Sequence, residues 1–372
     1  MSPFARKFLL PFHLWAGLTI GLILVVMAVS GAMLVYQKPL ERRFDAHRFV
    51  VTPGATRLPV SDLVTRARAA HPDVHLDSIH FSGEPTAPLI ALFSDNIYVH
   101  VNPYTGAILG LRQRYGESFG WIEGLHRFLR FTPSTGEPIT GYAALIFGLI
   151  ILTGFVLWWP ASRRALKAGL TLNRKLSGRP WSLNLHRTLG AYAGVMLLIS
   201  VTTGVPLSLD WAKHLVFVVT GSKEVGAPKI AADADAADIN FDAVAQSIAS
   251  VMPSAQDTYI PLPKKGVVPA YTVAMDASHP NARSYMWTDT NGKILRYTPY
   301  EKASVGFRLY YWMLSLHTAL VGGPVVPVML ILGALSIPVL AYTGAASYFR
   351  RKGGKSAVQA TKSVSVSQPS RT

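Results

Sequence analysis

The sequence has 372 residues, of which half are hydrophobic and only 15% are charged, and its mean hydropathy is +0.28. This balance excludes an ordinary soluble protein and indicates membrane spans. The net charge of +16 is concentrated in short basic segments beside apolar runs, which indicates membrane topology rather than nucleic-acid binding. The absence of cysteine excludes disulfides, iron–sulfur clusters and thioether-linked haem.

The acidic residues mark two polar blocks. All 20 lie within residues 41–137 and 210–301. The apolar run 8–36 is long enough, at ~1.5 Å per residue, to cross a ~30 Å hydrocarbon core, and it is too long for a typical signal peptide. Arg6 and Lys7 precede it, so we expect a retained helix whose N-terminus lies in the cytoplasm.

The first polar block predicts a small α+β domain outside the membrane. An amphipathic helix is expected at 60–70, followed by three strand-like runs, a turn at 102–106 and a returning strand. An interfacial helix containing His126 comes next. A break rich in Pro and Gly then precedes the second apolar run.

The same plan repeats in the second half. A third apolar helix carries His186, a second polar block follows, and an interfacial helix with His317 precedes a fourth apolar helix. Both halves run in the same direction, so the predicted fold is a mainly α membrane protein of four transmembrane helices in two parallel repeats, with two small α+β domains and interfacial helices. The predicted segments are transmembrane helices at 8–36, 139–160, 185–209 and 325–349, outer domains at 37–118 and 210–303, interfacial helices at 119–131 and 305–321, a basic cytoplasmic loop at 161–184 and a disordered cytoplasmic tail at 350–372.

Four of the eleven histidines stand at equivalent positions of the two halves. His13 matches His186 near the predicted cytoplasmic face, and His126 matches His317 near the outer face. Neutral imidazole is a common axial ligand of haem iron and can be buried without a charge penalty. We therefore predict two bis-histidine b-type haems, one held by each pair. The alternative for each histidine is a polar anchor at the membrane interface.

Small residues accompany the inner pair at identical offsets. Glycines stand four and eight residues after each histidine, on the ligand's own helix face, and they are Gly17, Gly21, Gly190 and Gly194. A strip without side chains lets the edge of a flat porphyrin come close to the helix. Close helix–helix packing is the alternative use of such glycines.

Other residues are assigned more general roles. Arg127 and Arg187 each follow a proposed ligand and can pair with haem propionates, with phospholipid contact and topology as alternatives. His47 and His214 are the alternative candidates for ligands of the outer haem. The five further histidines are expected on domain surfaces, and they are His71, His75, His80, His100 and His279. An aromatic belt, or a docking surface over the outer haem, is expected from Trp121, Tyr310, Tyr311 and Trp312.

The chain resembles the PepSY-associated transmembrane family over residues 8–352. The resemblance rests on the two histidine-bearing helices, the turns at 102–106 and 289–292, and the return helices with Thr153-Gly154 and Thr343-Gly344. This family comprises iron-regulated inner-membrane proteins of Gram-negative bacteria, including ferric-siderophore reductases with b-type haems. The resemblance implies that electrons from a quinol or a cytoplasmic reductase cross the lipid membrane through haem and reduce a periplasmic ferric siderophore. Independently of the resemblance, the basic residues beside the apolar runs predict cytoplasmic termini and argue against a nucleic-acid partner.

Two other functions are compatible with the sequence. PepSY domains are associated with peptidase inhibition, so the helices can serve as anchors of a binding or regulatory protein. An uptake permease without redox activity is the third possibility, although the expected transmembrane helices lack acidic residues, which argues against ion-coupled transport. The second outer domain departs from the family pattern by an extra segment at 221–237.

Overall fold

The computed structural model describes residues 3–224, 239–263 and 266–366, with side chains described between residues 6 and 351 of these ranges. The chain forms two compact units. The membrane unit contains Met1–Ala32, Leu125–Ser208 and Pro324–Thr372, and the sheet unit contains Met33–Gly124 and Leu209–Gly323. Most of the extra segment 221–237 and the end of the tail, 367–372, lie outside the described residues.

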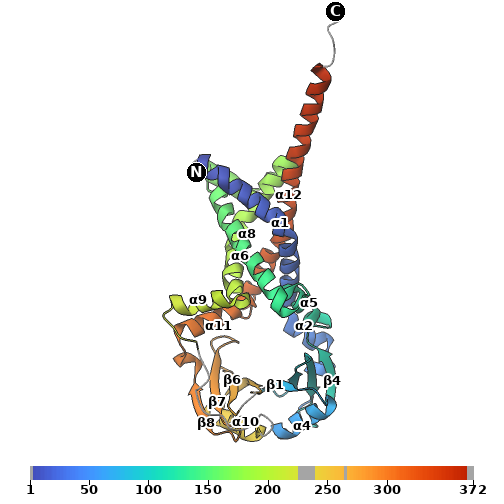
Figure 1. Cartoon of the computed structure of the whole chain (residues 1–372), viewed down its shortest axis with the longest axis vertical. Helices are drawn as coiled ribbons and strands as arrows, with labels where there is room; N and C mark the ends of the chain where they lie inside the picture. The colour runs from blue at the N-terminus through green and yellow to red at the C-terminus, as the bar shows by residue number, and fades with distance from the viewer. Residues whose placement is uncertain (1–2, 225–238, 264–265, 367–372) are drawn as a thin grey trace, which may run out of the picture. The chain divides into compact units, whose positions relative to one another are not determined.

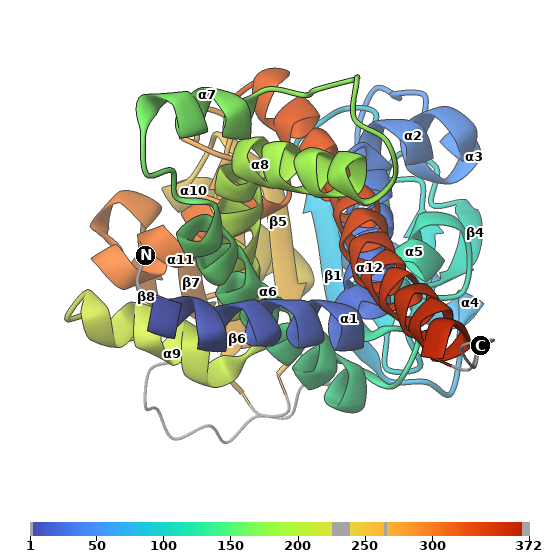
Figure 2. The same ribbon diagram turned by 90° about the horizontal axis from the view of Figure 1, so that it is seen from above.

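Four helices of the membrane unit are long and apolar enough to cross a membrane. They are α1 (Pro3–Leu34), α6 (Pro133–Trp158), α8 (Gly178–Ser208) and α12 (Val325–Val366). Their outer faces carry exposed apolar side chains such as Leu22 and Leu332, as expected for helices surrounded by lipid. Seen from above, α8 lies beside both α6 and α12, with which it packs (Figure 2).

The helix ends differ from those predicted. α6 begins at Pro133 rather than 139, because proline in the first turn of a helix lacks only an N–H that would have no intrahelical partner. A short helix, α7 (Arg163–Leu170), lies within the predicted basic loop. α12 continues to Val366, so disorder from residue 350 is wrong for the described part of the tail. No proline separates Pro338 from Pro369, and the helix can therefore propagate beyond the apolar span.

The strands of both halves join in one antiparallel sheet instead of forming two separate domains. Its order is β4-β3-β2-β1-β5-β6-β7-β8. The central pair β1–β5, here called the seam, places Ile79 opposite Ile260. Each half alone would leave β1 or β5 as an unpaired edge, and the seam removes both edges. The strands are β1 (Leu76–Ser82), β2 (Leu89–Phe93), β3 (Ile97–Val101), β4 (Ile108–Gln113), β5 (Ala255–Pro261), β6 (Val268–Ala274), β7 (Arg283–Thr288) and β8 (Ile294–Thr298).

One face of this sheet is covered by α4 (Val60–Ala70) and α10 (Phe241–Val251). Both helices, which Figure 1 shows beside the sheet, are amphipathic. Val64 and Val244 meet the inward strand residues Ile79 and Ile260 in a single core that runs across the seam. Each half has an equivalent turn before its last strand, β4 or β8. The glycine of each turn adopts the left-handed backbone conformation, with φ of 71° at Gly106 and 82° at Gly292.

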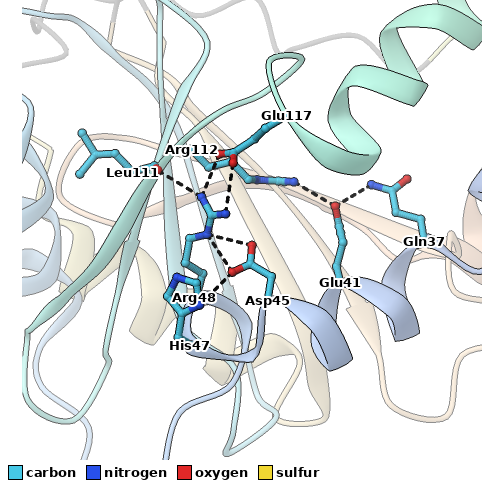
Figure 3. A network of polar contacts seen from close by, with 8 residues as sticks. All are labelled: Gln37, Glu41, Asp45, His47, Arg48, Leu111, Arg112 and Glu117. Atoms are coloured by element: carbon cyan, nitrogen blue, oxygen red, sulfur yellow. Dashed lines mark hydrogen bonds and ion pairs between the residues drawn. The ribbon is translucent and has the colours of Figure 1, made fainter.

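Two short helices that the sequence analysis missed follow α1 in the chain. They are α2 (Gln37–Phe44) and α3 (Ala46–Phe49). Arg48 bridges Asp45 and Glu117 at 2.8 and 2.9 Å, and Arg112 of β4 pairs with Glu41 at 2.9 Å (Figure 3). Both members of the second pair are about 10% exposed, so removing either would leave a nearly buried charge unpaired.

The second half adds α9 (Asp210–Val219), a 3₁₀ turn (Tyr300–Lys302) and α11 (Val305–His317). Tyr311 of α11 is 9% exposed and its hydroxyl lies 2.9 Å from that of Tyr285 on β7. Its assignment to an exposed aromatic belt is therefore wrong. Two histidines expected at the surface are also buried. His100 is fully buried, and His279 is held between Ser315 and Tyr300.

Candidate functional site

The structure brings together the two histidines predicted as the inner pair. His13 of α1 and His186 of α8 have ring centroids 6.1 Å apart, with ring planes at 86°. They stand 173 positions apart in the sequence, and no bond links the two rings directly. Their proximity therefore comes from the packing of the membrane helices.

His13 is oriented by the helix α6. Its Nδ1 lies 3.0 Å from the carbonyl oxygen of Ile150 and 3.1 Å from Oγ1 of Thr153. The Thr153 hydroxyl donates to carbonyls of its own helix, Leu149 among them, which leaves its oxygen to accept. A carbonyl oxygen can only accept a hydrogen bond, so Nδ1 of His13 must carry the proton. In the neutral ring the lone pair is then on Nε2.

His186 has the same surroundings in the second half. Its Nδ1 lies 3.0 Å from the carbonyl of Leu340 and 3.1 Å from Oγ1 of Thr343, both on α12. Nε2 is again the nitrogen with the lone pair. Among the described residues, no hydrogen bond reaches Nε2 of either ring. Both imidazoles are thus fixed in the tautomer that ligates a metal through Nε2.

A glycine follows the hydroxyl residue on each supporting helix and leaves room for the ring. A Cβ at Gly154 would come within 3.1 Å of His13 Cε1, and one at Gly344 within 3.4 Å of His186 Cε1. We call each set of carbonyl, hydroxyl three residues later and following glycine a support triplet. The two triplets are Ile150–Thr153–Gly154 and Leu340–Thr343–Gly344.

This donor set fits a haem iron. Two imidazoles that bind one metal from opposite sides, with metal–nitrogen bonds of ~2 Å, have ring centres roughly 6 Å apart, and the observed separation is 6.1 Å. Within the described residues, no group of three or more His, Asp or Glu side chains is arranged for a metal ion. A metal ion at His13 and His186 would therefore be held by these two imidazoles, with no third side-chain ligand among the described residues.

The four predicted glycines divide into two kinds. A Cβ at Gly17 or Gly21 of α1 would meet no atom within 4 Å, so these two positions border open space. On α8, a Cβ at Gly194 would come within 2.6 Å of Phe155 Cζ, and one at Gly190 within 3.7 Å of Leu340. The glycines of α1 leave room for a flat ring, whereas Gly194 serves close packing between α8 and α6.

His126, at the end of α5 (Ser118–Phe128), has a support triplet of its own on α1. Its Nδ1 lies 2.8 Å from the carbonyl of Met27 and 3.5 Å from Oγ of Ser30. A Cβ at Gly31 would come within 2.8 Å of its Cε1. The same spacing recurs in the sequence of α8 at Ser200, Thr203 and Gly204, where the internal repeat places the counterpart of Met27, Ser30 and Gly31.

The other predicted site residues have varied environments. His317 ends α11 in the sheet unit, whereas His126 lies in the membrane unit, and their pairing stays a prediction. Arg127 pairs with Glu137 at 2.7 Å, and Arg187 is exposed. The alternative candidates for ligands of the outer haem are both exposed, and they are His47, which pairs with Asp45, and His214.

The support triplets are the functional residues that sequence reasoning missed. The equivalent Thr-Gly pairs at 153–154 and 343–344 were visible as a repeat but had no assigned role. The sequence signal for them is a hydroxyl residue followed directly by glycine, which occurs on α6, on α12 and at Ser30-Gly31 of α1.

A family model described as PepSY-associated TM region matches residues 10–351. No curated protein sequence matches the chain.

Proposed function

Since this chain belongs to the PepSY-associated transmembrane family, we propose that it is a di-haem b oxidoreductase of the bacterial inner membrane. It passes electrons across the membrane and reduces a ferric siderophore in the periplasm. Its four apolar helices and its family support a multi-pass membrane protein. One observation carries the redox proposal, namely the separation of 6.1 Å between two imidazoles whose Nδ1 atoms are both tied to helix carbonyls.

The residues of the inner site have separate roles. Nε2 of His13 and of His186 would hold the iron, and the support triplets orient the rings and raise the basicity of their Nε2 atoms. Haem bound at this site supplies one-electron redox chemistry. The open space beside Gly17 and Gly21 accommodates the ring edge.

A second haem is proposed at His126 and His317. A ~30 Å apolar layer is wide for a single cofactor, so a site near each face shortens the distance that an electron must cross. The support triplet of His126 favours a ligand role, because it matches the two triplets of the inner pair atom by atom. Arg127 is held by Glu137 next to this ligand and can contribute to propionate binding.

The proposed reaction transfers one electron from a quinol or a cytoplasmic reductase to each ferric chelate. Fe(III) is reduced to Fe(II), and no bond of the siderophore is broken. Fe(II) is the softer ion and suits hard oxygen ligands less well, so the chelate weakens and iron is released. No protein acid or base is required, and we assign no catalytic residue.

The test is a reduced-minus-oxidised absorption spectrum of the purified full-length protein, with pyridine haemochrome quantitation. We expect b-type bands and two haems per chain. Absence of a haem band refutes the proposal and would leave a binding protein or a permease.

Ligand variants then test the pairing. His13→Ala and His186→Ala should each lose the same haem, since both rings hold one iron. His75→Ala, at an exposed position of the sheet unit, is the matched control and should retain both haems. Loss of different haems from the two variants would contradict the pairing.

A further inference from the structure

A row of aromatic side chains crosses the seam on the sheet face opposite α4 and α10. His80 on β1, Tyr259 on β5, Tyr271 on β6 and Tyr285 on β7 stand opposite one another in register. Successive ring centroids are 4.0, 4.8 and 5.6 Å apart. Because the rings stack against each other, their faces are occupied. Side chains stand roughly perpendicular to a sheet, so the hydroxyls of Tyr259 and Tyr271 lie at the outer edge of the row, whereas the Tyr285 hydroxyl contacts that of Tyr311 on α11.

Burial fixes the chemical state of these hydroxyls. It raises the pKa of Tyr259 and Tyr271 above the usual value of a phenol, and it does the same for Tyr98 on β3. All three therefore remain O–H groups at neutral pH. A protonated phenol donates a hydrogen bond, so the row offers donors to an oxygen-rich ligand.

Two guanidinium groups lie over aromatic rings on this face of the sheet. Arg283 lies over the rings of Tyr271 and Tyr311 at 4.5 and 4.8 Å, and Arg114 lies over Tyr98 at 6.0 Å. Nε of Arg114 is buried and has no hydrogen-bond partner among the described residues. Both cations contribute electrostatically at the Tyr271 phenol.

Neither Arg114 nor Arg283 forms an ion pair with a carboxylate in the described part of the chain, although Arg283 interacts with the Tyr285 hydroxyl and the carboxylate of Glu123 acts on Tyr98. Asp257, the acid beside Tyr259, is already paired with His80 at 3.1 Å. A ligand with negatively charged oxygens would supply the missing partners, because guanidinium recognises oxyanions with paired hydrogen bonds.

We propose that this face, defined by Tyr98, Tyr259, Tyr271, Arg114 and Arg283, binds an anionic, oxygen-rich chelate of a trivalent metal. The charge complementarity and the row of donors select against a neutral or cationic chelate. That this chelate is the substrate rests on the proposed function. The binding itself is independent of haem and of reduction.

The experiment uses the gallium(III) complex of a tris-catecholate, a trianionic chelate whose metal is not reduced. Its affinity for the full-length protein in detergent is measured by isothermal titration calorimetry. Arg283→Gln and Arg114→Gln should each weaken binding about tenfold, since each removes a charged donor. Tyr259→Phe and Tyr271→Phe keep the stacked rings and should weaken binding severalfold. Arg68→Gln, on exposed α4 at the opposite face, should leave the affinity unchanged.

The outcomes separate the two proposals. Haem-containing protein that does not bind the gallium chelate overturns this inference and leaves the reductase proposal standing. Protein without haem that binds it through Arg283 supports the inference and refutes the reductase. Equal affinities for wild type and both tyrosine variants also overturn the inference, and this result stands even where an arginine variant fails to fold.

Discussion

The substitution Gly154→Ala tests the support of His13 directly. The new Cβ would lie 3.1 Å from His13 Cε1, whereas carbon atoms in good contact are roughly 3.5–4.0 Å apart. The ring cannot retreat without stretching the hydrogen bonds from Nδ1 to Ile150 and Thr153. Overpacking of this kind costs about 1–3 kcal/mol. If that cost falls on the ligand position, the affinity for the inner haem should drop roughly 5- to 150-fold.

The matched control is Gly148→Ala on the same helix. Its new Cβ would also lie 3.1 Å from a neighbour, here the apolar Cγ1 of Val201. Both changes gain about 1 kcal/mol of helix propensity, so this contribution cancels between them. Haem per chain, the electron paramagnetic resonance spectrum of the ferric form and thermal stability are compared. Gly154→Ala should alter the inner haem, and Gly148→Ala should change stability alone. Equal effects of both variants on the haem would refute the role of the glycine.

The remaining predictions concern other parts of the same supports and one buried histidine. Thr153→Val and Thr343→Val each remove one acceptor from the Nδ1–H of a proposed ligand. Each should lower the affinity for the inner haem by about tenfold and shift the midpoint potential of that haem in a redox titration. Unchanged potentials would contradict the support role. Gly31→Ala should disturb the haem bound at His126 and leave the inner haem spectrum intact. His100 is neutral because burial, with nearby arginines, lowers its pKa to about 4 from 6.5, so stability is complete above about pH 6.5 and falls as the pH drops toward 4, by up to about 3 kcal/mol. His100→Phe should flatten this dependence in thermal unfolding measured from pH 7 to 4.5, and equal slopes for both proteins would count against it.

Local pattern was sufficient to predict much of the fold. The helix at 60–70 and the strands Leu89–Phe93 and Ile97–Val101 lie where the periodicity places them, because each buries one apolar face against the same core. The four long apolar helices follow from composition and length alone. The pairing of His13 with His186 could be predicted because the internal repeat aligns the two histidines at equal offsets from their glycines.

Local sequence pattern does not predict the contacts between distant segments. The seam requires β1 to pair with β5, and the sequence of neither strand identifies the other as its partner. A surface position is predicted for His100, yet its ring lies 5.0 Å from that of Phe49 and the charge of Arg112 acts on it. The role of Thr153 is set by a residue 140 positions earlier, and a single sequence does not contain that information.

The seam also constrains the order in which the protein can be made. About 170 residues separate Ser82 from Ala255, and two membrane helices, α6 and α8, lie between them. At a synthesis rate of ~5–20 residues per second, β1 waits roughly 10–35 s for its partner strand. During that interval its backbone offers an open hydrogen-bonding edge. Biogenesis therefore has a vulnerable window in which a chaperone or a neighbouring chain competes with β5, and truncation after the first half would make that window permanent.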